Sequence, residues 1–243
     1  MKSEDVASLY DEQIKKKYKK EYEHARWFSD KAKEAEYAMT KTTILRHLKN
    51  IPSCRSYLEV GPGPGTWTKL FFNKDKETTY TLVDVSKEML ALAQKNMPQD
   101  ASVSLVHSGF LEAQFSTLYD FIFSSRAIEY IEDKSRLVKK LSSLLKKNGH
   151  GVIITKNPDP VRLFFRRKKL SKLHQNQIRS TSLKKLLKKE ELIVRRITPA
   201  TVHVPLIGFP ALNKFVFALV GRLPLNPLTS VVTESYCVSF KKP

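Results

Sequence analysis

The first residues of this sequence with the types and spacing of a binding site form a glycine-rich segment. Residues 61–65 read Gly-Pro-Gly-Pro-Gly and directly follow the apolar segment 56–60. Glycines in such a turn let the chain bend sharply and let a ligand approach the backbone closely. The two prolines lack the backbone N–H groups on which a phosphate cradle depends. Position 66 is Thr66, so the spacing also departs from a dinucleotide fingerprint. We therefore expect this loop to bind a ligand other than a pyrophosphate.

Two acidic residues end the apolar segments beside this loop. Glu59 lies two residues before the first glycine, where a carboxylate suits a ligand with a cationic group. Asp84 follows the apolar segment 80–83 and lies 19 residues beyond Gly65. An acidic side chain at that place can accept hydrogen bonds from both hydroxyls of a ribose. The two acids together predict a ligand with a ribose and a positive charge but no phosphate, which describes S-adenosylmethionine.

The elements that must position these residues alternate between strands and helices. Five apolar segments predict strands, at Ser56–Val60, Tyr80–Val83, Val103–His107, Phe121–Ser124 and Gly151–Thr155. Helices are expected at Thr66–Asn73, at Lys87–Asn96 behind an N-cap at Ser86, and from an N-cap at Asp133 to a closing Asn148-Gly149. This order indicates an α/β fold in which helices cover both faces of a parallel sheet.

The segments before and after this core have different patterns. Residues 1–50 predict two helices, 5–23 and 30–49, that cover the cofactor site, and residues 51–157 form the core. We assign 158–243 to a basic and apolar insertion plus the last strands of the same domain. Its expected parts are a basic run, a short helix, a strand and a final strand, at Arg162–Lys172, Ser182–Lys189, 192–204 and Ser235–Phe240.

Residues 40–157 resemble the class I S-adenosylmethionine-dependent methyltransferases, most closely the ubiquinone and menaquinone type that acts on small molecules and lipids. The resemblance is carried by the glycine-rich motif, the acidic end of the second strand and the later elements in order: Glu59–Gly65, Leu82–Ser86, Val106–Phe110, Tyr119–Ser125 and, less well kept, Leu144–Gly149. It implies a Rossmann-like, seven-stranded, mostly parallel sheet. It also implies S-adenosyl-L-methionine as the cofactor.

The resemblance assigns cofactor contacts residue by residue. They are Glu59, Gly61, Gly63, Gly65, Asp84, Val85, Gly109, Phe110 and Ser125. The family usually has an Asp at the position of Gly109, where it binds the adenine amino group. In this sequence backbone contacts, with packing by Phe110 and Val85, must replace that carboxylate.

Methyl transfer from a sulfonium is an in-line displacement, so the protein has to position the acceptor and remove its proton where needed. The candidates follow the fourth strand: Ser125, Arg126, Glu129 and Tyr130. We expect Glu129 and Tyr130 to be catalytic, with Glu129 as a general base, although an ordinary carboxylate at the start of a helix has the same signature. The Asn/Asp-Pro-Pro motif of base-amino methylation is absent after the fourth strand. The histidines lack ligand spacing, so no metal is expected.

The formal net charge of +19 is concentrated in the last third of the chain. Residues 158–243 hold 17 Lys and Arg against 4 Asp and Glu. The basic segment Arg162–Arg196 has no aromatic residue after Arg166 and precedes the apolar, proline-broken segment 205–231. Such an order favours an anionic membrane surface over nucleic acid. The apolar segment could also be core, or a lid over a hydrophobic acceptor pocket.

Two cysteines are too few for a disulfide scaffold, and the first residues carry no apolar signal segment, so we expect a cytoplasmic protein, with a peripheral membrane location open. The sequence thus predicts a methyltransferase that acts on oxygen or carbon of a small, lipid-like or isoprenoid-like acceptor. Two alternatives remain: a methyltransferase of RNA or another anionic macromolecule, and a non-catalytic S-adenosylmethionine-binding protein.

Overall fold

A computed structural model describes most of the chain. The described residues are Val6, Ser8, Asp11, Glu12, 22–72, 77–158, 176–204 and 209–243. Most of the first expected helix, 5–23, and the basic run Arg162–Lys172 lie outside them. The same holds for the first four residues of the apolar segment 205–231.

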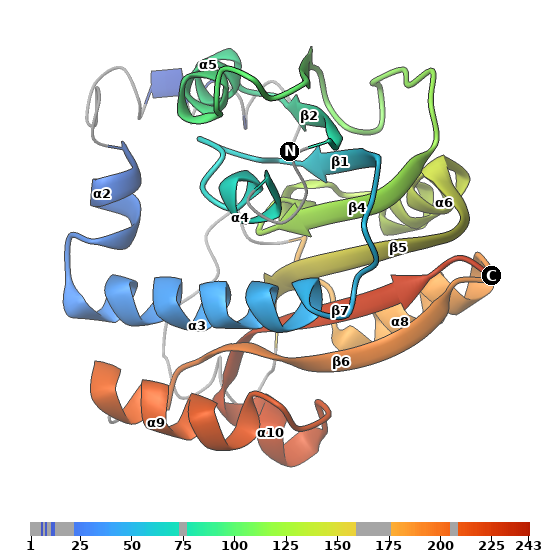
Figure 1. The fold of residues 1–243 in the computed structure, drawn as a ribbon. Coiled ribbons are helices and arrows are strands. Elements are labelled where there is room, and N and C mark those ends of the chain that lie inside the picture. Colours follow the sequence, from blue (N-terminus) through green and yellow to red (C-terminus); the bar gives the residue numbers. More distant parts are fainter. Residues whose placement is uncertain are drawn as a thin grey trace.

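The described part of the chain is built around a seven-stranded sheet with the strand order β3-β2-β1-β4-β5-β7-β6 (Figure 1). Its strands are β1 (Ser56–Val60), β2 (Thr79–Asp84), β3 (Val103–His107), β4 (Tyr119–Ser125), β5 (Leu145–Lys156), β6 (Ile193–Val202) and β7 (Thr233–Lys241). Strands β1 to β5 run parallel to one another, and β7 is antiparallel to both β5 and β6. This confirms the predicted Rossmann-like α/β fold with a mostly parallel sheet.

The strand order reverses direction between β1 and β4. From β1 the chain builds outward through β2 to β3, and then returns to add β4 on the other side of β1. Val60 and Ser124 are paired at the carboxyl ends of these two strands. The connections that leave such neighbouring strands diverge to opposite sides, which opens a crevice at the edge of the sheet.

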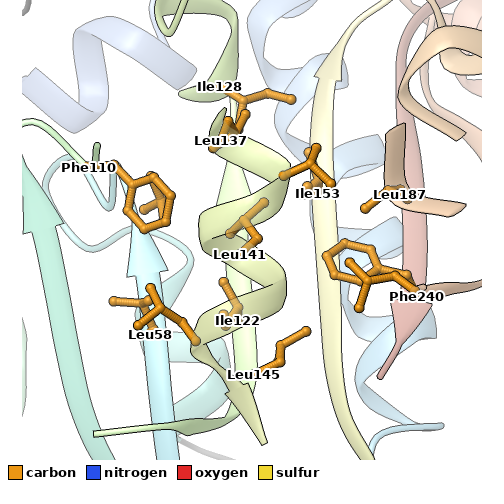
Figure 2. Close-up of a cluster of buried hydrophobic side chains, with 14 of the residues drawn as sticks. Leu58, Phe110, Ile122, Ile128, Leu137, Leu141, Leu145, Ile153, Leu187 and Phe240 are labelled. Atoms are coloured by element: carbon orange, nitrogen blue, oxygen red, sulfur yellow. The ribbon is translucent and has the colours of Figure 1, made fainter. Parts of the chain in front are cut away.

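Helices cover both faces of the sheet (Figure 1). They are α2 (Tyr22–Trp27), α3 (Lys31–Leu48), α4 (Thr68–Phe72), α5 (Lys87–Asn96), the 3-10 helix η2 (Ile128–Tyr130), α6 (Lys134–Leu144), α8 (Ser180–Lys189), α9 (Pro210–Val220) and α10 (Pro227–Val232). On one face Leu137 and Leu141 of α6 pack in one cluster with Ile122 of β4 and Ile153 of β5 (Figure 2). On the other face Ile44 of α3 packs in a second cluster, which includes the aromatic side chains of Tyr57, Phe71 and Phe121.

Local signals in the sequence set where the helices begin. The Ser86 hydroxyl accepts a hydrogen bond from the Met89 backbone at 3.1 Å, and the Asp133 carboxylate accepts one from the Arg136 backbone at 2.8 Å. Both predicted N-caps are therefore confirmed. Each satisfies a backbone donor that the helix leaves unpaired, an effect of about 1 kcal/mol.

One expectation about a helix end was wrong. Asn148-Gly149 lies within β5 and does not close α6, which ends at Leu144. The segment pairs with the C-terminal end of the chain, because Asn148 donates to the Lys242 carbonyl at 3.1 Å and Lys242 donates back to the Gly149 carbonyl at 2.9 Å. Pro210 begins α9, since a proline in the first turn loses no helical hydrogen bond. In the described part of the chain, no helix is both long and apolar enough to cross a membrane.

Candidate functional site

A cavity of about 1530 Å³ opens at the carboxyl ends of β1, β2, β3 and β4. Of the residues predicted from the sequence, its walls contain Gly61, Gly63, Asp84, Val85, Gly109, Phe110, Ser125 and Tyr130. Glu59, Gly65 and Glu129 do not line it. The cavity lies where the strand order reverses, which is the usual ligand position in open α/β sheets.

The glycine loop is shaped by close packing against its neighbours. Gly61 has φ +69°, and a Cβ atom built on it would lie 2.3 Å from the Cβ of Ala127. The Gly61 N–H also donates to the Val83 carbonyl at 2.8 Å, which ties the loop to the end of β2. Gly63 has φ +55° but open space around its Cα. Position 61 thus requires glycine because a side chain there would collide with Ala127. At Gly63 the backbone itself faces the cavity.

Asp84 ends β2 with a half-buried carboxylate in the cavity wall. Its Oδ2 accepts a hydrogen bond from the Gly63 backbone at 3.3 Å, and its Oδ1 accepts one from the Ser86 backbone at 3.0 Å. Burial raises the pKa of Asp84 to about 6, against the opposing effect of these two hydrogen bonds. A carboxylate has about four lone-pair positions, so Asp84 can still accept hydrogen bonds from a ligand.

Glu59 lies beneath the glycine loop and is fully buried. Its Oε2 accepts hydrogen bonds from the hydroxyls of Tyr57 and Thr68, each at 2.7 Å. Burial raises the pKa of Glu59 to about 7. Because side chains alternate along a strand, Glu59 points to the face of β1 that packs on α4. Glu59 therefore does not line the cavity, whereas its Oε1 is buried without a hydrogen-bond partner among the described residues, so its role in cofactor binding stays a prediction.

Arg126 follows β4 in a left-handed conformation with φ +62°, which is unusual for a residue with a side chain. Its Nε donates to Glu129 Oε1 at 2.8 Å and its Nη1 to Glu36 Oε1 at 3.0 Å. The other oxygen of Glu129 accepts from Thr155 at 2.9 Å. Although burial opposes ionisation of Glu129, the Arg126 guanidinium keeps its pKa below the ordinary value.

These contacts change the role expected of Glu129. A general base has to reach the proton that it removes. Glu129 is fully buried, both of its oxygens accept hydrogen bonds from protein groups, and it lies outside the cavity wall. Its geometry is that of a positioning residue that holds Arg126. Both Arg126 and Tyr130 line the cavity.

Two hydroxyl groups in the wall are buried without a protein partner. Among the described residues, the Oγ1 of Thr66 and the Oγ of Ser125 have no hydrogen bond, and both residues line the cavity. An unpaired buried hydroxyl costs about 1–3 kcal/mol, so both positions favour a ligand that brings polar groups. Ser125 was predicted from the sequence, whereas Thr66 was missed, although it directly follows the glycine loop.

Residues from the N-terminal region complete the wall. Val6, Tyr22, Arg26 and Trp27 line the cavity beside the sheet residues. The Trp27 ring packs edge-on against Trp67 with 5.3 Å between ring centroids. The sequence placed this region over the site in general terms but did not single out Trp27. In the described part of the chain, no group of three His, Cys, Asp or Glu side chains could hold a metal ion.

Comparison with known proteins adds a family and a set of similar folds. A family model described as a methyltransferase domain matches residues 18–195. The chain is 28% identical over 109 residues to the malonyl-(acyl-carrier protein) O-methyltransferase of Halalkalibacterium halodurans, which covers 43% of this chain and 40% of that protein. It is 25% identical over 115 residues to the demethylmenaquinone methyltransferase of Bacillus licheniformis, and this match covers 46% of this chain and 50% of that protein. The matches thus span half or less of these relatives.

Among solved structures, the fold is similar to that of the N-methyltransferase NodS from Bradyrhizobium japonicum WM9 in complex with S-adenosyl-L-homocysteine. The TM-score is 0.60 and the identity 14%, with 90% of this chain and 91% of that chain covered. At this identity the likeness shows the fold that the two chains share.

Proposed function

The chain belongs to the methyltransferase domain family, and from this premise we propose that it is an S-adenosyl-L-methionine-dependent methyltransferase with a small-molecule acceptor. The observation that carries the proposal is Asp84, whose half-buried carboxylate lies beside the backbone of Gly63 at the end of β2. A carboxylate at this place suits the two hydroxyls of a ribose. The buried, unpaired hydroxyls of Thr66 and Ser125 suit further polar groups of the same ligand.

The remaining wall fits the rest of the cofactor. Val85, Met89, Gly109 and Phe110 line the same cavity and offer apolar surface and backbone for a base. When bound, S-adenosylmethionine supplies a methyl group on a sulfonium, which a lone pair or carbanion of the acceptor attacks. The chain itself has to orient the acceptor, and we assign this task to Tyr130 in the wall and to Arg126, held by Glu129.

We propose a small, partly apolar acceptor that is methylated on oxygen or carbon. Trp27, Tyr130 and Ile131 supply aromatic and aliphatic surface. The two relatives above are named for a malonyl group on a carrier protein and for demethylmenaquinone, which supports acceptors of this size. Four carboxylate residues face the cavity against two arginines, so the wall repels a polyanion such as RNA: Asp84, Glu112, Glu132 and Asp133 against Arg26 and Arg126.

The substitution Asp84→Asn tests the cofactor assignment. We expect isothermal titration calorimetry to show about 10- to 100-fold weaker binding of S-adenosylhomocysteine, because a hydrogen bond to a charged group contributes about 1.5–3 kcal/mol. Since the pKa of Asp84 is about 6, the affinity of the unaltered protein should fall between pH 8 and pH 5, when the carboxylate becomes protonated. Asp84→Asn should not show this pH dependence.

The control for this experiment is Asp100→Asn, which removes the same charge from an exposed turn after α5. It should bind S-adenosylhomocysteine like the unaltered protein. Unchanged affinity in Asp84→Asn, or the same pH dependence in both variants, would contradict the assignment. Binding of the cofactor without methyl transfer to any acceptor in a broad panel would support the non-catalytic alternative.

A lipid-like acceptor requires access to a membrane, and the exposed side of α9 supports such access. Phe215 and Leu219 of α9 are 62% and 60% exposed, and Phe209, Leu223 and Leu228 nearby are exposed as well. Lys214 of α9 is exposed as well. Apolar side chains with adjacent cations are the pattern of a segment in the interface of an anionic bilayer. We therefore propose that this surface rests on an anionic membrane.

We expect the protein to sediment with vesicles that contain phosphatidylglycerol and much less with pure phosphatidylcholine. Phe215→Ser combined with Leu219→Ser should reduce vesicle binding at least about fivefold, because two exposed apolar groups no longer enter the interface. The matched control is Leu118→Ser with Ile193→Ser, two side chains that are 49% and 46% exposed elsewhere. Equal binding by both double variants, or no binding by the unaltered protein at low salt, would overturn the membrane proposal.

A further inference from the structure

A second cavity, of about 400 Å³, lies away from the first, toward the start of β5. It is enclosed by the C-terminal half of α3, the middle of β5, β6, the end of β7 and the turn after α9. Its walls carry four arginines and two histidines: Arg46, Arg195, Arg196, Arg222, His47 and His150. Among the residues that line it, none is Asp or Glu. This cavity takes no part in the proposed methyl transfer.

A β-bulge brings two of these arginines to the same cavity. In β6, Val194 pairs with Phe240 and Arg196 pairs with Ser239, so Arg195 is an additional residue opposite β7. In a regular strand successive side chains point to opposite faces, whereas a bulge re-aims one of them. Both Arg195 and Arg196 therefore line the cavity.

The other contacts hold the cationic groups in place without neutralising them. Arg46 Nη1 donates to the Gly221 carbonyl at 3.2 Å, and its guanidinium lies 5.0 Å from the centre of the Phe217 ring. Arg196 Nη2 donates to the Arg222 carbonyl at 3.3 Å. Within the described ranges, none of the four arginines forms an ion pair with a carboxylate.

The titration of the neighbouring groups reflects this excess of positive charge. Burial, followed by the fields of Arg196 and Arg46, lowers the pKa of His47 to about 4. Burial, followed by the field of Arg222, lowers the pKa of Arg46. Several like charges around one concave surface raise the local concentration of anions. An anion in this cavity would reduce the repulsion among the arginines.

We propose that this cavity binds the phosphate group of an organic phosphate, either a free metabolite or the headgroup of a lipid. Guanidinium groups match phosphate oxygens with paired, charge-assisted hydrogen bonds, so several arginines around one cavity are suited to a phosphate. Ile51 and Val152 line part of the remaining cavity and can contact an apolar part of the same molecule. The volume lies within the range of small-molecule sites.

The double variant Arg195→Glu/Arg222→Glu tests this site, and inorganic pyrophosphate serves as the probe. Both residues are exposed, so the fold should persist, which thermal unfolding checks. We expect calorimetry at low salt to show pyrophosphate binding by the unaltered protein and at least about tenfold weaker binding by the double variant. The matched control is Lys184→Glu/Lys188→Glu, which changes the net charge equally on the exposed side of α8 and should bind as before.

The two sources of the phosphate are distinguished with phosphatidylglycerol vesicles. Pyrophosphate binding lost in the double variant but kept in its control supports a soluble phosphate. Vesicle binding lost in the same selective way, without pyrophosphate binding, supports a lipid headgroup. No binding of either probe, or an equal loss in both double variants, overturns the proposal. The affinity for S-adenosylhomocysteine should be the same in all of these proteins, so failure of this site and failure of the methyltransferase assignment are separate outcomes.

Discussion

Gly61→Ala should weaken the binding of S-adenosylhomocysteine by about 100-fold and lower the free energy of unfolding by about 2–4 kcal/mol. The new Cβ would lie 2.3 Å from the Cβ of Ala127, far inside van der Waals contact. The residue would also keep a left-handed backbone at φ +69°, which costs about 1–2 kcal/mol for alanine. The loop and η2 have to move apart, and the cavity wall that includes Gly61 and Ala127 moves with them. Calorimetry and urea unfolding measure the two effects.

Two further variants separate contact from backbone strain. Gly63→Ala adds a methyl group at φ +55° with no atom within 4 Å, so it should lose only about 1–2 kcal/mol of stability. The double variant Gly61→Ala/Ala127→Gly removes the atom that collides, so it should recover the part of the loss that comes from the contact, while the backbone strain of about 1–2 kcal/mol at position 61 remains. A loss of stability in the double variant that is smaller than the sum of the losses in Gly61→Ala and Ala127→Gly is the signature of a direct contact. Equal losses in Gly61→Ala and Gly63→Ala, with no recovery in the double variant, would refute the packing argument.

The sequence was sufficient for the part of the site that depends on the order of strands and helices. An alternating pattern places the carboxyl ends of parallel strands at one edge of the sheet, and this locates Asp84, the glycine loop and Ser125 together without further information. Motif spacing alone could not determine whether the Glu59 side chain lines the cavity. A shift of one position along a strand moves a side chain from the cavity wall to the opposite face, under the loop. Its neighbour Val60 lines the cavity, and Glu59 does not.

Contacts between distant parts of the chain were beyond the sequence. Glu129 has the local signature of a free carboxylate at a helix start, and its partner Arg126 in turn binds Glu36, 90 residues earlier. The segment Asn148-Gly149 has the composition of a helix stop, but hydrogen bonds to Lys242 extend β5 through it. The second cavity likewise depends on a β-bulge in β6 that no local sequence pattern predicts. In each case tertiary pairing determines what a locally ambiguous residue does.

Arg126→Met should lower the free energy of unfolding by about 3–5 kcal/mol at pH 8, which is the usual cost of removing one partner of a buried ion pair. Arg126 joins Glu129, which is fully buried, to Glu36, whose side chain is 17% exposed. Methionine keeps much of the apolar stem but leaves both carboxylates without the guanidinium. Urea unfolding measures the loss. Arg26→Met is the control, because Arg26 contacts Glu36 at a longer 3.5 Å and is 31% exposed, and it should cost less than about 1 kcal/mol.

The pH dependence separates this electrostatic effect from a simple packing defect. In the unaltered protein Arg126 opposes the effect of burial and holds the pKa values of Glu129 and Glu36 below the ordinary value, so their contribution to stability is lost as the pH falls through those lowered values. Without Arg126, burial raises both pKa values, and the folded variant binds more protons than the unfolded chain above about pH 4.5. The deficit relative to the unaltered protein should therefore shrink between pH 8 and pH 5. Arg126→Met/Glu129→Gln should be less pH dependent than Arg126→Met, because it no longer contains the buried carboxylate. A deficit that is the same at both pH values would mean that Arg126 acts through packing, and Glu129 would then lose its role as the residue that positions it.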